Sequence, residues 1–244
     1  MEKLKSSELS LLIDKYSRVL VEVRKRIVFT LIVFAVSTVA GFIFYEDIIT
    51  YMVKFLSLQG INIVFTSPFQ FINLAIGCGI ASGVVISLPL LVSQILYFLK
   101  PALKVKEFKM LVRFLPFSFL LFLIGFVFGT LIMRWQIEIF LSQTISLGIG
   151  NVLDISGLLT TVLMTSLLMG IGFQFPIILL LLLRIGLISQ NGLSSKRPWV
   201  YLFSFTFTLF LPPDSILADI LLSLPLIFLF ELTLILNRIF DKKH

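Results

Sequence analysis

The sequence has two isolated acids among clusters of basic residues, and a carboxylate can recognise a cationic ligand. Glu22 lies in the segment 21–26 with three basic residues, and Glu107 is the one acid in the segment 100–113 beside five basic residues. A carboxylate accepts two parallel hydrogen bonds from a guanidinium, so it selects arginine over other cations. The two acids therefore predict a binding site for a ligand with two arginines. The alternative is that both acids only neutralise neighbouring cations at a surface.

Four other polar side chains lie within long apolar runs. They are the amides Gln94 and Gln174 and the acids Asp219 and Glu231. Polar groups inside a bilayer need partners, and intramembrane acids are functional candidates. Pro176 follows Gln174 closely and removes a backbone hydrogen bond, which predicts a kinked helix with a polar notch. The structural alternative assigns Gln174 to helix–helix hydrogen bonds and Asp219 to contact with water, and Gln94 with Pro89 marks a second irregular helix.

Other site chemistries lack the residues that they require. The chain has one cysteine, Cys78, and one histidine, His244. A disulfide within the chain, a cysteine-rich zinc site, an iron–sulfur cluster and a bis-histidine haem are therefore excluded. The sequence also has no glycine-rich phosphate loop and no Ser–His–Asp set. We predict a protein that is not an enzyme, uses no metal or cofactor and has no nucleic-acid partner.

The composition places these residues in a membrane protein. Of the 244 residues, 58% are apolar and 14% are charged, with a mean hydropathy of +1.08. Soluble domains carry about 25% charged residues. Runs largely free of charge predict an all-α membrane protein with six transmembrane helices. The predicted spans are 27–44, 72–99, 114–133, 158–183, 199–211 and 216–236.

The last two predicted helices are short or interrupted. The span 199–211 has 13 residues, about 20 Å of helix, whereas the hydrocarbon core is about 30 Å thick. Two acids and a proline interrupt the span 216–236, and Pro212, Pro213 and Asp214 predict a sharp turn between the two spans. Two short helices would thin the bilayer around them. The alternative is one re-entrant hairpin in place of the two spans.

The basic residues orient the six spans. Eighteen of the 20 lie in the N-terminal segment, the loops after the second and fourth spans, and the tail, and the other two are Lys54 and Arg134. Basic loops stay on the cytoplasmic side of a membrane, or on its matrix or stromal equivalent. Both termini are therefore predicted on that side. A re-entrant hairpin would break this charge separation, so it is disfavoured. Near the same side, Glu231 is expected to pair with Arg238 or Lys242.

Three regions make up the predicted organisation. Residues 1–26 form an amphipathic N-terminal segment that lies on the membrane surface or docks on a partner helix. Residues 27–238 form one six-span membrane domain, and residues 239–244 form a basic tail. A cleaved signal peptide is not expected, because the first apolar run is long and lacks a small-residue exit site.

Short motifs recur in a characteristic order along nearly the whole chain. They lie at residues 20–26, 66–71, 89–94, 98–103, 107, 172–176, 196–198, 211–214 and 230–232. Each motif is weak alone, but their order and spacing across six spans are specific. The pattern resembles the TatC family, the multi-span core of the twin-arginine, or Sec-independent, protein translocase.

The resemblance implies a function and a set of site residues. TatC-like proteins bind signal peptides with paired arginines at the cytoplasmic-side face, and recruit single-span subunits of the TatA and TatB type. They move folded proteins across the bilayer with the proton-motive force, as copies assembled in a complex. By position, Glu22, Arg24, Phe98 and Glu107 form the signal-peptide site. Gln174 stands where many bacterial members have a glutamate, so a polar partner-contact site is implied there without the charge.

The residues leave two other functions open. A secondary transporter of a small solute or ion would gather Gln94, Gln174 and Asp219 near the middle of the membrane. A signal receptor would instead present Glu22 and Glu107 beside a groove on the basic side. A structural subunit of a respiratory or assembly complex would bind no soluble peptide.

The compartment is predicted from composition and motif details. The chain has 26 phenylalanines, which is typical of an AT-rich organellar genome. The Gln–Phe–Pro and Pro–Pro–Asp motifs resemble mitochondrially encoded members. We therefore predict the mitochondrial inner membrane, with a plastid thylakoid membrane or a bacterial plasma membrane as alternatives.

Overall fold

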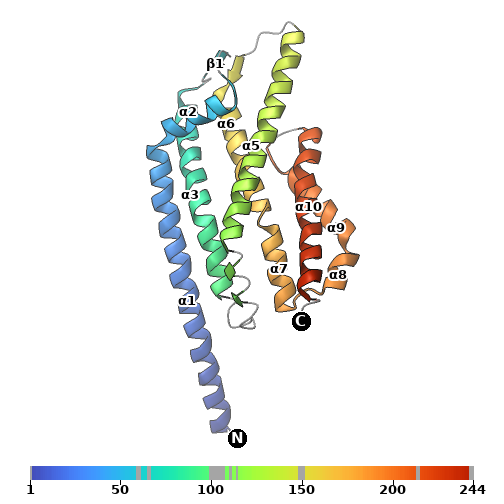
Figure 1. Ribbon diagram of the computed structural model, residues 1–244. Coiled ribbons are helices and arrows are strands. Elements are labelled where there is room, and N and C mark those ends of the chain that lie inside the picture. The colour runs from blue at the N-terminus through green and yellow to red at the C-terminus, as the bar shows by residue number, and fades with distance from the viewer. Residues whose placement is uncertain are drawn as a thin grey trace.

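The computed structural model describes residues 2–58, 62–64, 67–98, 108–109, 112–113, 115–147, 152–212 and 215–241. Within them nearly all of the backbone is helical, and the long helices run side by side in one bundle (Figure 1). The elements are α1 (Glu2–Ile43), α2 (Tyr45–Phe55), β1 (Asn62–Val64), α3 (Pro68–Phe98), α5 (Leu115–Ser146), β2 (Val152–Asp154), α6 (Ile155–Gly172), α7 (Phe175–Ile185), α8 (Gln190–Ser195), α9 (Arg197–Leu209) and α10 (Ile216–Asp241).

The predicted all-α membrane fold is confirmed. Five helical stretches are long and apolar enough to cross a membrane: Val21–Ile43, Pro68–Phe98, Leu115–Thr144, Ile155–Leu183 and Ile216–Ile239. The predicted short helix is α9, which has 13 residues. In Figure 1, α1 begins and α10 ends toward the lower side of the bundle. We term this side the basic end and the opposite side the outer end.

Two helices are longer than the sequence predicts. α10 is a continuous helix of 26 residues, about 39 Å long, so α9 alone is too short for the bilayer. Asp219 does not interrupt α10 because it lies in the first turn, where the helix dipole favours an acid. α5 continues past Met133 to Ser146, and within this extension Arg134 Nε donates to Glu138 Oε1 at 2.9 Å, one turn later.

Small residues bring α1 and α3 into close contact. A Cβ added to Gly79 would lie 2.8 Å from the backbone oxygen of Thr38. A Cβ added to Gly41 would lie 2.4 Å from Ser82 Oγ. Close backbone approach of this kind is how helices associate where the surrounding lipid provides no hydrophobic driving force. The pair α1–α3 is therefore packed by shape, and a larger side chain at either glycine would push the helices apart.

Two short strands, which the sequence does not predict, pair with each other at the outer end. β1 and β2 pair in parallel, with Asn62 opposite Val152. Asp154 ends β2 and caps α6, since its Oδ1 accepts from the backbone nitrogen of Ser156 at 3.1 Å. Gln70 Nε2 donates to Asp154 Oδ2 at 3.2 Å. These bonds join the start of α3 to the start of α6.

α1 passes through the predicted boundary at residue 26 without a break. It has 42 residues, about 63 Å of helix, and in Figure 1 it extends well beyond the other helices at the basic end. The N-terminal segment therefore continues the axis of the first span rather than turning along the membrane surface. Its division from the membrane domain stays a prediction.

Candidate functional site

Hydrogen bonds between α1 and α3 place Gln94 at their contact near the basic end. Thr30 Oγ1 donates to Gln94 Oε1 at 2.6 Å. Arg26 Nη1 donates to the backbone oxygen of Gln94 at 3.1 Å. Gln94 therefore joins two helices.

Glu22 lies one helical turn before Arg26 and forms an ion pair with it. The Glu22 side chain is 61% exposed, whereas the Arg26 side chain is 26% exposed. Arg26 thus bridges a carboxylate on the surface and a backbone carbonyl of α3. The carboxylate of Glu22 is open to a second cation from outside.

A largely apolar groove runs along this contact, and we term it the α1–α3 groove. Its volume is about 370 Å³, and aliphatic side chains from both helices line it together with Arg26, Thr30, Gln94 and Phe98. Phe98 ends α3 and is 41% exposed. The groove therefore combines a long apolar surface with a guanidinium that is bound to a surface carboxylate.

The structure brings together only part of the predicted signal-peptide site. Phe98 lines the basic end of the α1–α3 groove directly. Glu22 is connected to the groove through its ion pair with Arg26, which also lines it. Arg24 is exposed, and it points away from Glu22 because two residues turn a helix by about 200°. Glu107 lies outside the described residues.

Gln174 is buried at a break in the fourth span. α6 ends at Gly172 and α7 begins at Phe175, so the kink predicted from Pro176 is present. Gln174 Nε2 donates to the backbone oxygen of Ser118 on α5 at 3.1 Å, and its Oε1 accepts from Ser118 Oγ. Gln174 is 3% exposed. Its amide therefore ties the break to α5.

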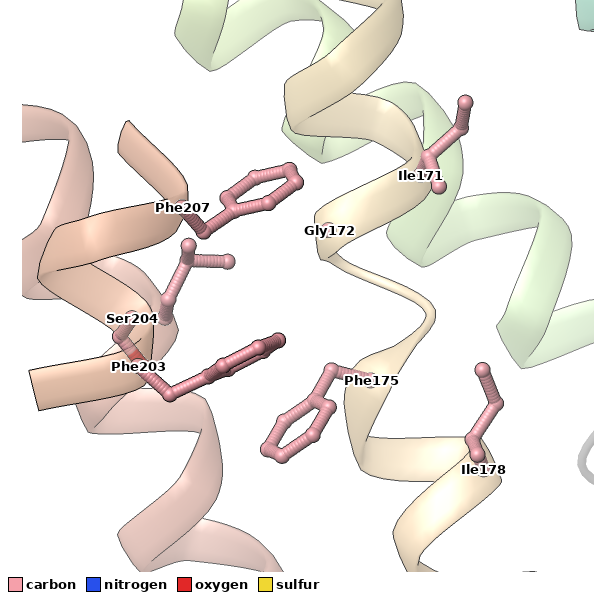
Figure 2. Close-up of a pocket in the computed structure, with 8 residues that line it drawn as sticks. Ile171, Gly172, Phe175, Ile178, Phe203, Ser204 and Phe207 are labelled. Carbon is pink, nitrogen blue, oxygen red and sulfur yellow. The ribbon is translucent and has the colours of Figure 1, made fainter. Parts of the chain in front are cut away.

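A small apolar pocket opens beside this break. Its volume is about 160 Å³. Figure 2 shows the rings of Phe203 and Phe207 on α9 directed toward Gly172 and Phe175, where α6 gives way to α7. Ser204 is its one hydroxyl-bearing lining residue. The pocket is too apolar to hold an ion or a polar solute.

Glu231 contacts two side chains of the span before its own. Tyr201 Oη donates to Glu231 Oε1 at 2.6 Å, and Arg197 Nη2 lies 3.1 Å from Glu231 Oε2. Both partners belong to α9, a pairing that the sequence does not predict, and Lys242 lies outside the described residues. The acid joins the last two spans at the basic end.

Asp219 is buried, 5% exposed, in the first turn of α10 at the outer end. The prediction that it reaches water is therefore wrong. The predicted turn before it is described only at Pro212, since Pro213 and Asp214 lie outside the described residues. The polar groups do not form one midplane cluster: Gln94 bonds to α1 and Gln174 to α5, and Asp219 begins α10 at the outer end.

Sequence reasoning missed several residues that build these contacts. Arg26 could have been found, because Glu22 and Arg26 have the i, i+4 spacing of a helical ion pair. Thr30, Ser118 and Tyr201 carry no such signal, since each bonds to a residue at least 30 positions away. Their roles depend on which helices pack together.

Comparison with known proteins decides the family. The model of the family described as "TatC: Sec-independent protein translocase protein (TatC)" matches residues 18–225. The chain belongs to the TatC family. TatCy of Bacillus subtilis (strain 168) is 27% identical over 98% of this chain and 92% of that protein. TatC of Listeria innocua is 29% identical over 88% of each chain.

A solved TatC structure has the same fold. The crystal structure of the Twin Arginine Translocase Receptor TatC in DDM is 25% identical, with a TM-score of 0.78 over 89% of this chain and 98% of that chain. As a TatC protein, this chain is a multi-pass membrane component of a Sec-independent protein translocase. It is a transport subunit rather than an enzyme, and the alternative of a small-solute transporter is not supported.

Proposed function

We propose that this TatC protein is the signal-peptide receptor and the membrane scaffold of a twin-arginine translocase, which moves folded proteins with the proton-motive force. One observation carries the proposal. The exposed carboxylate of Glu22 lies beside Arg26 at the basic end of the α1–α3 groove, where Phe98 also lies. The similar solved protein described as a twin arginine translocase receptor supports the same function.

The groove suits a peptide with arginines followed by apolar residues. A peptide guanidinium takes the place of the Arg26 guanidinium on Glu22, because both offer the same fork of donors to a carboxylate. Arg26 keeps its bond to the Gln94 carbonyl. Apolar residues of the peptide then cover the aliphatic lining of the groove. Arg24 and Glu107 complete the proposed site, with Glu107 as the second carboxylate.

Crosslinking tests this function. The detergent-solubilised protein receives a peptide with two arginines and a photoreactive group, and a matched peptide has two lysines. We expect crosslinks on α1 and α3 with the arginine peptide only, since lysine lacks the bidentate fork. Equal crosslinking by both peptides, with the protein shown to be folded by circular dichroism, would contradict a twin-arginine receptor.

We also propose single-span subunits of the TatA and TatB type as partners. The supporting observation is the apolar pocket beside the break at Gln174, together with the outward faces of α9 and α10. Trp199 is 72% exposed, Phe203 is 63% exposed and Phe210 is 82% exposed. A cysteine at position 203 should crosslink to such a subunit in membranes, and one at Val36 on α1 should not. Several copies of the chain in one complex are part of the same proposal.

The compartment stays a prediction. The phenylalanine content supports the mitochondrial inner membrane, and the relatives compared above are bacterial. Fractionation of the source cells, with antibody detection in mitochondrial, plastid and plasma membranes, would decide among the three.

A further inference from the structure

A second groove lies at the outer end, beneath α2, and we term it the α2–α5 groove. Its volume is about 430 Å³. Tyr51 and Phe55 of α2, Val127 and Thr130 of α5, and Leu163 and Ser166 of α6 are among the residues that line it. Figure 1 shows α2 lying across the outer end of the bundle. The groove therefore opens where the lipid chains meet the headgroups of the outer leaflet.

The walls of this groove favour an apolar occupant. The hydroxyls of Thr130 and Ser166, which line the groove together with Tyr51, lie 2.8 Å apart. Their two protons serve three hydrogen-bond positions: the contact between the two hydroxyls, the Phe126 carbonyl 2.9 Å from Thr130 Oγ1, and the Val162 carbonyl 2.7 Å from Ser166 Oγ. No donor of these two side chains is left for a polar ligand. Water or a solute there would lose hydrogen bonds, whereas a hydrocarbon chain would lose none.

Charged groups of both signs lie at the α2–α5 groove: the acid Asp47 of α2 is one of its lining residues, and two basic residues lie near Phe55. The guanidinium of Arg134 lies 5.7 Å from the centre of the Phe55 ring, which lines the groove. Lys54 precedes Phe55 in the last turn of α2. These are the two basic residues that the charge pattern places on the outer side. The two basic residues that the sequence predicts for the outer side are therefore a neighbour of Phe55 in α2 and a residue whose guanidinium faces the Phe55 ring.

The groove is too small to enclose more than one turn of a transmembrane helix. One turn of a helix with its side chains is about 10 Å wide and 5.4 Å long, so it fills about 420 Å³. The whole groove of about 430 Å³ therefore takes one turn at most. An acyl chain is thinner and can run along the groove.

We propose that the α2–α5 groove is a phospholipid site. The phosphate binds Arg134 at the outer end, and one acyl chain lies between α2, α5 and α6. Arg134 already pairs with Glu138 at 2.9 Å, and its Nη donors supply the bonds to the phosphate. The site is separate from the α1–α3 groove, so it stands whether or not that groove binds signal peptides.

Native mass spectrometry of the detergent-solubilised, delipidated chain tests this site. The probes are phosphatidylglycerol and a diacylglycerol with the same two acyl chains. We expect one tightly bound phosphatidylglycerol per chain and roughly tenfold weaker binding of diacylglycerol, which lacks the phosphate. Arg134→Gln should reduce phosphatidylglycerol binding to the diacylglycerol level. Val127→Phe should weaken both lipids by filling the groove.

Two matched variants serve as controls. Val36 on α1 is 64% exposed and Val127 is 50% exposed, so Val36→Phe adds the same bulk to a surface away from the groove. Arg113→Gln removes a cation at the basic end. Both controls should bind lipid as the parent chain does. Equal binding of the two lipids, or equal binding by the parent, Arg134→Gln and Val127→Phe proteins, would overturn the proposal. A polypeptide crosslinked to Val127→Cys in place of bound lipid would also overturn it.

Discussion

Glu22 and Glu231 are the same residue type, and each pairs with an arginine, yet their surroundings differ. Glu22 is 61% exposed and pairs with Arg26 of its own helix. Glu231 is 29% exposed, and α9 engages both of its oxygens through Tyr201 and Arg197. An exposed pair within one helix contributes about 0.3–0.5 kcal/mol, so a ligand displaces it easily. The location of the partner therefore separates a carboxylate that can bind a ligand from one that joins two helices.

The strongest test reverses the charge of the exposed acid. Glu22→Lys should weaken binding of a twin-arginine peptide roughly 100-fold, about 2.7 kcal/mol, because it removes the acceptor and adds a repelling cation. Fluorescence anisotropy with the detergent-solubilised protein measures the affinity. Glu138→Lys is the matched control, since Glu138 also forms an exposed i, i+4 pair but lies at the outer end. Unchanged affinity in Glu22→Lys would remove Glu22 from the site.

The packing of α1 on α3 can be broken without touching any charge. Gly79→Val should lower the free energy of unfolding by about 2 kcal/mol, because the new side chain meets the Thr38 carbonyl. Thermal unfolding in detergent measures this loss, and peptide affinity should fall with it. Gly77→Val is the control, because a Cβ at Gly77 meets nothing within 4 Å. Equal melting temperatures of the two variants would contradict the close helix contact.

Neutralising Glu231 should lower the stability of the protein and leave its peptide affinity unchanged. Glu231→Gln removes the ion pair with Arg197 and keeps an acceptor for Tyr201, so the loss should be about 1 kcal/mol. Thermal unfolding of Glu231→Gln, Arg197→Gln and the double variant measures the coupling between them. Peptide affinity should stay at the parent value. A fall in affinity as large as that of Glu22→Lys would end the distinction between the two acids.

The smallest expected effect concerns the resident partner of Glu22. Arg26→Gln should bind the twin-arginine peptide roughly twofold more tightly, because the peptide no longer competes with a pair worth about 0.3–0.5 kcal/mol. The same anisotropy titration measures it, with Arg134→Gln as the control for loss of a cation elsewhere. Weaker binding by Arg26→Gln would show that Arg26 positions the carboxylate rather than competing for it.

The sequence predicts features that depend on one segment at a time. Apolar runs bounded by charges locate the six predicted membrane helices, because each charged residue adds its own free-energy cost of insertion into the bilayer. Pro176 predicts the break beside Gln174, because a proline removes a backbone hydrogen bond from its own helix. The partners of Glu231 and Gln174 could not be predicted, since they depend on how α9 packs on α10 and how α5 packs on α7. Arg197 lies 34 positions before Glu231 in the sequence, and the packing of α9 on α10 brings the two side chains together.

The parallel pairing of β1 with β2 has a consequence for biogenesis. Asn62 and Val152 are paired, and the two long helices α3 and α5 separate them in the chain. At a synthesis rate of about 5–20 residues per second, β1 leaves the ribosome roughly 5–18 s before β2. The strands meet only if α3 and α5 have both been inserted, because failure of either helix leaves β1 and β2 on opposite faces of the membrane. Closure of this small sheet therefore indicates that the second and third spans, α3 and α5, cross the membrane in opposite directions.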